Sequence, residues 1–297
     1  MILYYALGGG LGHLTRSLAL IEHAPETLKS RMRILVSTKS AYAAEQCFPC
    51  PVDRVPDQAM ADAGGYEKYL TDYFKIYSFR CVVMDTFPFG LLGEMKYRMP
   101  HIPRVLVGRY LRWEAYRAAC GGVDNAAWPE DALVIEEQDA IYDSELHNHG
   151  FVAMAPWPVS PVRPSDVPKP SAEPACCIVH SGPPVEIDQL VHLAKRVMAE
   201  KCIPGLPRIF TPENALFPME RHLSGFRNIV TGAGYASCAA ALVLKGHVQY
   251  HLNPFKRKFD DQHLRFERLK RGTWPGAGPG NVSHAARTLW DLVGLHI

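Results

Sequence analysis

A glycine-rich segment near the start of the chain combines residue types suited to proton transfer and anion binding. Four glycines stand within Gly8–Gly12, and His13 follows directly. The apolar run Met1–Leu7 precedes them, and the leucine spacing over Leu14–His23 is typical of a helix. A strand, a glycine turn and a helix present backbone N–H groups to an anion, and histidine transfers protons near neutral pH. A tight turn with a surface histidine is the alternative.

A second segment, Ile229–Ser237, shows the same order of apolar strand, glycine turn and helix. A hydroxyl at Ser237, in the first helical turn, could donate to a phosphate. The residues of this turn that we select as candidates for binding an anionic group are Thr231, Gly232, Gly234, Tyr235 and Ser237. A turn that binds no ligand is equally compatible with this pattern.

A third segment, Pro254–His263, places two acids and an amide at the boundary between a loop and a helix. Asp261 and Gln262 could hydrogen-bond the hydroxyls of a sugar. They could equally cap the helix that follows, because acidic side chains are favoured at helix N-termini.

The first 155 residues alternate between short apolar runs and helical patterns. The expected strands are Ile2–Leu7, Arg33–Ser37, Cys81–Met84, Arg104–Val107 and Leu133–Glu136. The expected helices are Leu14–His23, Ala41–Gln46, Gly65–Tyr77 and Gly90–Arg98. Such alternation predicts an α/β fold with a doubly wound parallel sheet, whose ligands bind at the carboxyl ends of the strands.

Residues 156–170 hold six prolines, which block both helix and central strand. We therefore predict a domain at 1–155, a linker at 156–175 and a second domain at 176–297. The second half has expected strands at Cys176–His180, Arg208–Phe210, Asn228–Val230 and Val248–Tyr250, and expected helices at Glu186–Ala199, Gly234–Leu244, Asp261–Leu269 and Ser283–Leu295. Both halves open as strand, loop and helix, which predicts two facing Rossmann-like domains.

Bulk composition narrows the class of partner. The chain has 297 residues, a net charge of +2 and 47% apolar residues, which argues against nucleic acid as the main partner. Basic residues gather at Lys256–Lys258 and Arg265–Arg271, so contact with phosphates or an anionic membrane surface stays open. We expect no transmembrane segment, no signal peptide and no zinc site, and scattered reduced cysteines favour a cytoplasmic protein.

In order and spacing, the three segments resemble those of GT-B glycosyltransferases. That group includes the N-acetylglucosaminyltransferase of peptidoglycan synthesis and the UDP-sugar-dependent transferases of natural-product pathways. The resemblance implies that Gly10, Gly12 and His13 face an acceptor, and that Thr231–Ser237 holds a donor diphosphate. It also implies that Pro254, with Asp261 and Gln262, contacts the donor sugar.

The first segment is also similar to the nucleotide-sugar hydrolase of pseudaminic acid synthesis, whose histidine activates water. Gly10, Gly12, His13 and Arg16 match its pattern. That family places an aspartate after a mid-domain strand, which implies that Asp85 points into the cleft and orients His13. Capping of the next helix is the alternative for Asp85.

Further candidates follow from the same resemblance. It implies that the loop with His180 and Ser181 lies near the donor phosphates. Arg109 could reach a phosphate or remain a surface residue. Neither resembled family needs a metal for its chemistry, so we expect no metal and no cofactor, with a nucleotide-sugar, most simply a UDP-sugar, as co-substrate.

The chain departs from the transferase pattern in being short and in lacking a glutamate for the ribose, where Ala239–Ala241 stand. Our leading hypothesis is a glycosyltransferase of the hexosyltransferase type with His13 as general base. A nucleotide-sugar hydrolase and a non-catalytic nucleotide-sugar-binding protein are the alternatives. The sequence does not identify the sugar, the nucleotide base, the acceptor or the oligomeric state.

Overall fold

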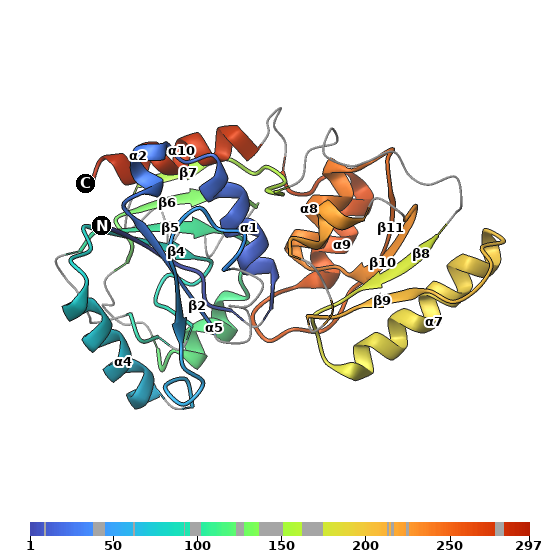
Figure 1. Cartoon of the computed structure of the whole chain (residues 1–297), viewed down its shortest axis with the longest axis horizontal. Coiled ribbons are helices and arrows are strands. Elements are labelled where there is room, and N and C mark those ends of the chain that lie inside the picture. The colour runs from blue at the N-terminus through green and yellow to red at the C-terminus, as the bar shows by residue number, and fades with distance from the viewer. Residues whose placement is uncertain are drawn as a thin grey trace.

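Two parallel β-sheets lie side by side in the molecule, each with helices on both faces (Figure 1). The computed structural model describes residues 1–8, 10–37, 45–61, 63–91, 93–95, 102–122, 128–136, 151–161, 175–212, 214, 217–223, 226–276 and 282–297. The large sheet belongs to the N-terminal half of the chain and the small sheet to the C-terminal half, as the predicted two-domain α/β architecture requires.

The large sheet has the strand order β3-β2-β1-β4-β5-β6-β7, with every pair parallel. Its strands are β1 (Ile2–Tyr5), β2 (Met32–Ser37), β3 (Val52–Val55), β4 (Cys81–Asp85), β5 (Arg104–Gly108), β6 (Asp131–Val134) and β7 (Phe151–Met154). Strand order reverses between β1 and β4, where Ile2 pairs with Cys81. Ligands of doubly wound sheets bind at such a point, so the residues after β1 and β4 are well placed to act together.

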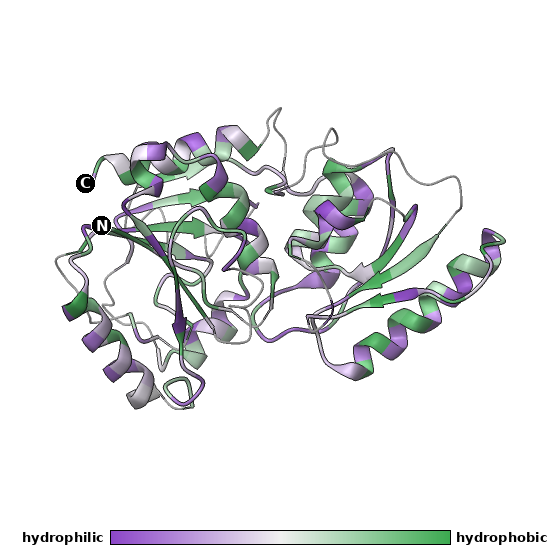
Figure 2. Cartoon of the chain, in the orientation of Figure 1, coloured by the Kyte–Doolittle hydropathy of each residue, from purple (hydrophilic) through white to green (hydrophobic). Residues whose placement is uncertain are grey.

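Helices cover both faces of this sheet because its strands are apolar on both sides (Figure 2). Ile2 and Tyr4 pack toward α1 (Gly12–Glu22) and α10 (Val282–Gly294), whereas Leu3 and Tyr5 pack on the other face. That second face carries α4 (Ala63–Ile76) and α5 (Trp113–Ala119). A short helix, α2 (Glu26–Lys29), connects α1 to β2.

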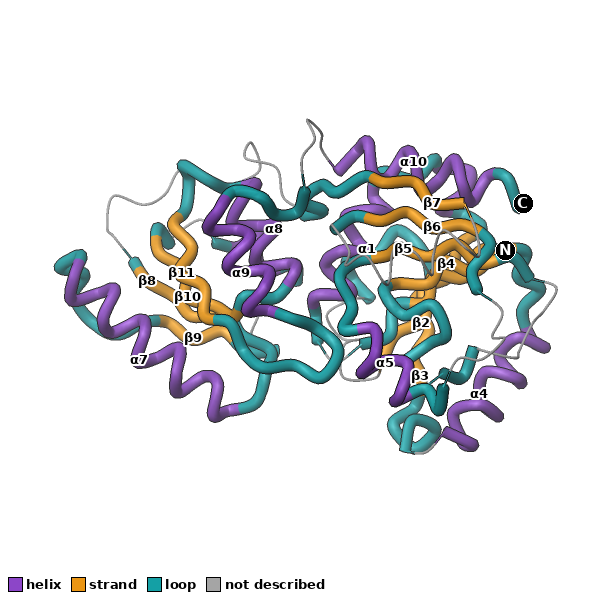
Figure 3. Tube along the Cα trace, turned by 180° about the vertical axis from the view of Figure 1, so that it is seen from behind, coloured by secondary structure: helices purple, strands orange, loops and turns teal. Residues whose placement is uncertain are grey.

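The small sheet has the order β11-β10-β8-β9, again all parallel. Its strands are β8 (Cys176–Val179), β9 (Arg208–Phe210), β10 (Asn228–Gly232) and β11 (Gln249–Asn253). Helix α7 (Pro184–Glu200) lies on one face, while α8 (Tyr235–Val243) and α9 (Gln262–Arg271) lie toward the large sheet (Figure 3). A 3₁₀ turn, η2 (Met219–His222), precedes β10.

The sequence prediction missed both edge strands of the large sheet. β3 has the sequence Val-Asp-Arg-Val and is partly exposed, so it lacks the apolar run of a buried strand. The helix expected over Gly90–Arg98 is wrong in its described part, which forms turns because Gly90 and Gly93 adopt positive φ angles of 82° and 85°. Most of the expected helix Ala41–Gln46 and most of the linker lie outside the described residues.

The last helix does not belong where the sequence placed it. We assigned it to the 176–297 unit, but α10 packs against α1, β5 and β6 of the large sheet. The indole Nε1 of Trp290 donates to the backbone oxygen of Leu20 at 2.9 Å. The C-terminal segment therefore completes the N-terminal core, while the other domain boundaries stay predictions.

Candidate functional site

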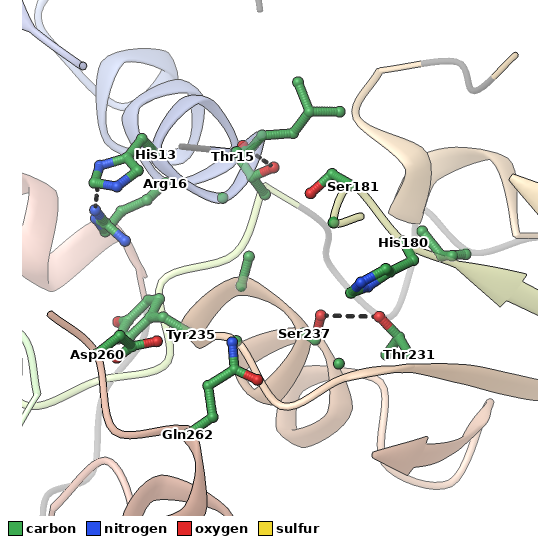
Figure 4. A pocket seen from close by; sticks show the side chains of 18 of the residues that line it. His13, Thr15, Arg16, His180, Ser181, Thr231, Tyr235, Ser237, Asp260 and Gln262 are labelled. Atoms are coloured by element: carbon green, nitrogen blue, oxygen red, sulfur yellow. Dashed lines mark hydrogen bonds between the residues drawn. The ribbon is translucent and has the colours of Figure 1, made fainter. Parts of the chain in front are cut away.

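A cavity of about 540 Å³ lies between the carboxyl ends of the two sheets (Figure 4). Its volume falls within the range of small-molecule sites. Its wall includes most of the residues selected from the sequence: Gly10, Gly12, His13, Arg16, Arg109, His180, Ser181, Thr231, Gly232, Gly234, Tyr235, Ser237 and Gln262. Asp85 lies behind this wall and Asp261 beside it.

His13 stands in the first turn of α1, at the end of the turn that follows β1. Its Nδ1 hydrogen-bonds the carboxylate of Asp85, and its ring stacks on Phe87 with 5.6 Å between centroids. A Cβ on Gly8 would lie 2.1 Å from the ring, so the close approach of the Gly8 backbone requires glycine. The contact with Asp85 fixes the proton on Nδ1 and leaves Nε2 as the basic nitrogen.

Asp85 ends β4 and is fully covered. Arg16 donates to both of its oxygens, from Nε at 2.8 Å and from Nη2 at 2.5 Å. Burial alone would favour the neutral acid, but Arg16 and His13 outweigh it and hold the pKa of Asp85 at about 2. The side chain therefore orients His13 as an ionised carboxylate, rather than capping a helix.

Electrostatics favour the neutral form of His13. Burial lowers its pKa below 6.5, and the charges of Arg16 and Arg109 act in the same direction, whereas Asp85 opposes them. At neutral pH the imidazole is consequently unprotonated on Nε2. A neutral histidine oriented by a carboxylate can accept a proton from a hydroxyl or from water.

The second glycine turn brings the N-terminus of α8 to the same cavity. Gly234 is the N-cap of α8 without a side-chain cap, so the first-turn N–H groups have no acceptor within the helix. Thr231 and Ser237 place their hydroxyl oxygens 3.3 Å apart at this end. A Cβ on Gly12 would lie 3.8 Å from that of Ala236, so α1 and α8 meet at their N-termini.

His180 and Ser181 follow β8 on the same side of the cavity (Figure 4). The Nε2 of His180 lies 2.7 Å from Glu186, whose carboxylate also accepts from Arg257 Nη2 at 2.6 Å. Burial lowers the pKa of His180. A Cβ on Gly10 would lie 3.2 Å from Ser181 Oγ, so the first glycine turn and the loop after β8 are close neighbours.

The third segment divides its roles between neighbouring residues. Asp261 is the N-cap of α9 and accepts from Leu264 N at 2.9 Å, which is the structural alternative considered for it. Gln262 lines the cavity, and its carbonyl oxygen accepts from Phe255 N at 3.0 Å. Of the two acids in this segment, the one that lines the cavity is Asp260, which sequence reasoning did not select.

Other wall residues also escaped sequence reasoning. Aromatic side chains come from three loops and from the end of β9: Phe87, Phe217 and Phe259 from the loops, and Phe210 from the strand. Glu220 of η2 adds a carboxylate. Phe87 could have been found from its place two residues after Asp85, but the loop aromatics and Glu220 carry no local signal. Ala239 and Ala240 are fully buried in α8.

Comparison with known proteins identifies the fold. The sequence matches no protein-family model and no curated protein. Among solved structures, the glycosyltransferase of kitacinnamycin covers 99% of this chain and 95% of its own, at 15% identity and a TM-score of 0.56. Spinosyn rhamnosyltransferase SpnG covers 99% and 91%, at 11% identity and a TM-score of 0.56. S. aureus MnaA, solved with UDP, covers 100% and 90%, at 11% identity and a TM-score of 0.57.

The chain has the GT-B fold. This confirms the fold that the three segments indicated. In the GT-B arrangement the large sheet with His13 forms the N-terminal domain and the small sheet with α8 forms the C-terminal domain, so the cavity lies in the cleft between domains.

The described part of the chain offers neither a cluster of metal ligands nor a membrane-spanning helix. No group of three or more His, Cys, Asp or Glu residues there could hold a metal ion. Among the same residues, no helix is long and apolar enough to cross a membrane.

Proposed function

We propose that the protein is a glycosyltransferase that moves a sugar from a nucleotide-sugar to an acceptor hydroxyl or amine, with His13 as general base. The observation that carries the proposal is one cavity with an oriented base on one wall and an uncapped helix N-terminus on the other. The His13–Asp85 pair forms the first wall and the start of α8 the second.

The C-terminal domain would hold the donor. The partial positive charge at the start of α8 stabilises negative charge on a diphosphate, which becomes a better leaving group. The hydroxyls of Thr231 and Ser237 and the loop of His180 and Ser181 would add donors around it. One of the similar structures, S. aureus MnaA, was solved with UDP, which supports a nucleoside diphosphate as the probe to test first.

The N-terminal domain would activate the acceptor. Nε2 of His13 takes the acceptor proton as the new glycosidic bond forms and the bond between sugar and diphosphate breaks. Ionised Asp85 stabilises the resulting imidazolium. General base catalysis of this kind is worth about 10²–10⁴-fold in rate.

The test pairs a binding assay with a turnover assay. Thermal-shift screening against UDP-, dTDP-, GDP- and CMP-sugars identifies the donor, because a ligand that binds only the folded protein raises its melting temperature. His13→Gln should then lose most turnover and keep donor binding. His23→Gln is the matched control, since His23 follows the same helix and bonds the backbone oxygen of Ala19 outside the cavity. Near-normal turnover of His13→Gln would refute the assignment.

A nucleotide-sugar hydrolase is the second candidate. The contacts of His13 and Arg16 with Asp85 favour it, because all three match the hydrolase pattern. The same base would then take a proton from water. Stoichiometric release of sugar from the donor without any acceptor would identify hydrolysis, whereas binding without turnover would indicate a non-catalytic protein.

The proposed chemistry needs no metal ion. The start of α8 supplies the positive potential that a metal would otherwise provide at a diphosphate. Turnover should therefore survive EDTA, and loss of turnover that Mg²⁺ restores would contradict this part of the proposal.

A further inference from the structure

A loop of the C-terminal domain is seated in the N-terminal domain. This docking loop, residues 254–261, connects β11 to α9. The backbone N–H of Arg112 donates to Phe259 O at 2.9 Å, and the Phe259 ring meets Phe87 edge-on at 6.0 Å. The loop therefore packs against the residue on which His13 stacks.

A buried chain of polar contacts runs from this loop to the base. Arg109 donates from Nη1 to Asp260 Oδ1 at 2.9 Å, and from Nε to Thr86 Oγ1 at 3.1 Å. Arg16 donates to the same hydroxyl at 2.8 Å while it holds Asp85. Asp85 in turn holds His13. Arg109 is 8% exposed and Thr86 fully buried, so water does not compete freely for these contacts.

Thr86, the junction of this chain, has an unusual backbone. Its φ is +73°, a strained conformation that a β-branched residue rarely adopts. It directly follows Asp85, so its conformation sets where the carboxylate lies. The two guanidinium donors on its hydroxyl help to hold it there.

At the other end of this series of polar contacts, Asp260 is held by a second arginine. Asp260 accepts from Arg265 at 2.6 Å, and Arg265 reaches Glu136 of the N-terminal domain at 2.6 Å. Burial alone would raise the pKa of Asp260, but Arg265 and Arg109 outweigh it and hold the carboxyl ionised. Asp260 is therefore a fixed charge whose position depends on how the docking loop sits.

We propose that Arg109 is a positioning residue that couples the seating of the docking loop to the geometry of the His13–Asp85 pair. When the loop is seated, Asp260 fixes one end of the guanidinium and its Nε holds Thr86. When the loop withdraws, Arg109 loses its carboxylate partner and Thr86 loses a fixed donor. The base is therefore correctly positioned only while the docking loop is seated.

The kinetic part of this inference rests on the proposed function, but its structural part does not. The charged groups that face His13 are Asp85 from β4, Arg16 from α1 and Arg109 from the loop after β5. Because the positive charge of Arg109 lowers the pKa of His13, removing that charge should raise it.

The test measures two quantities, the pKa of His13 and the rate of turnover. The pKa comes from NMR titration of the imidazole, whose signal is assigned by its loss in His13→Gln. Arg109→Met should raise the pKa of His13 and lower kcat by about 10–100-fold, with donor Kd changed far less. Asp260→Asn should also lower kcat, and the double variant should be no worse than the poorer single one, because the two residues act through one contact.

Two further variants separate positioning from mere stability. Thr86→Val keeps the shape but removes the shared acceptor, so it should lower kcat without removing any charge. Arg33→Met is the control, because Arg33 makes a bidentate ion pair with Asp53, at 2.6 and 2.7 Å, inside the N-terminal domain. This variant should lower the melting temperature and leave the His13 pKa and kcat unchanged.

The proposal is overturned if Arg109→Met and Asp260→Asn only lower the melting temperature, as Arg33→Met does, with the His13 pKa unmoved. It is also overturned if the double variant shows additive losses. Should no donor turn over, the proposed function fails, but the NMR titration still decides whether Arg109 acts on His13.

Discussion

Substitution of Gly8 by alanine tests whether the position of His13 is what the first glycine turn provides. The added Cβ would lie 2.1 Å from His13 Cδ2 and 2.2 Å from Nε2. Ordinary contact begins near 3.4 Å, so the ring must retreat by about 1.3 Å. Gly8 does not adopt a positive φ, so the effect comes from this collision rather than from backbone strain.

Such a retreat has two effects on the proposed base. It disrupts the hydrogen bond between His13 and Asp85, and it moves Nε2 away from the reacting proton. A misplacement of about 1 Å costs on the order of 10²-fold in rate. We therefore expect kcat of Gly8→Ala to fall by about that factor, while the donor dissociation constant, which the proposed function assigns to the C-terminal domain, changes little.

The assay is steady-state turnover beside a donor titration, with a thermal melt to confirm folding. Gly294→Ala is the control, because a Cβ there would meet no atom within 4 Å. The reasoning is refuted if Gly8→Ala keeps turnover within about threefold of the parent. It is equally refuted if donor affinity falls in parallel with kcat, since that would place the glycine turn at the donor.

Three further outcomes follow from the same contacts. The pKa of Asp85 is about 2 against an ordinary 3.8, so its ionisation stabilises the folded state by about 2 kcal/mol above pH 4. This contribution disappears as pH falls from 4 toward 2. Urea unfolding across that range should show the loss of stability in the parent and not in Asp85→Asn. Because burial lowers the pKa of His13 below 6.5 and the neutral form is the base, kcat/KM should hold at pH 6.5 and fall only at lower pH; an acid limb above 6.5 would contradict the neutral base. Asp261→Ala removes the cap of α9 and should lower the free energy of unfolding, measured in urea, by about 1 kcal/mol. Asp261→Asn should lower it much less, because asparagine also caps helices. Equal losses in the two variants would show that Asp261 does not act as the cap.

The central strands could be predicted because burial on both faces leaves a local mark. β1 and β4 are apolar runs that lead into a glycine turn and an acid, and β10 has apolar Ile229 and Val230 just before its glycine turn; each was found within a residue or two. The carboxyl ends of β1 and β4 meet at the point where the strand order of the large sheet reverses, and the small sheet turns the end of β10 toward them, which is why His13, Thr231 and Ser237 line one cavity. The contact of His13 with Asp85 was predicted through the family resemblance rather than from spacing.

What the sequence could not provide depends on how distant segments dock. Asp260 and Arg265 look like a helix start and a surface helix in isolation. In the fold Arg265 is buried against Glu136, and the part-buried Asp260 pairs with Arg109, both of the N-terminal domain. No local pattern around Arg109 indicates that it pairs with Asp260, which lies 151 residues further along the chain. Asp261 was selected for the sugar because the resembled segment has an aspartate directly before a glutamine, and local pattern cannot tell which of the two adjacent acids the helix uses as its cap.

The return of α10 to the large sheet changes how this chain can be divided. Cutting at the proline-rich segment would leave an N-terminal fragment without the helix that covers β5 and β6, and Trp290 would lose its acceptor on Leu20. A stable N-terminal half would have to carry residues 282–297 joined behind residue 161. Exchange of the C-terminal half of this chain for that of another GT-B protein would likewise succeed only with the native last helix retained.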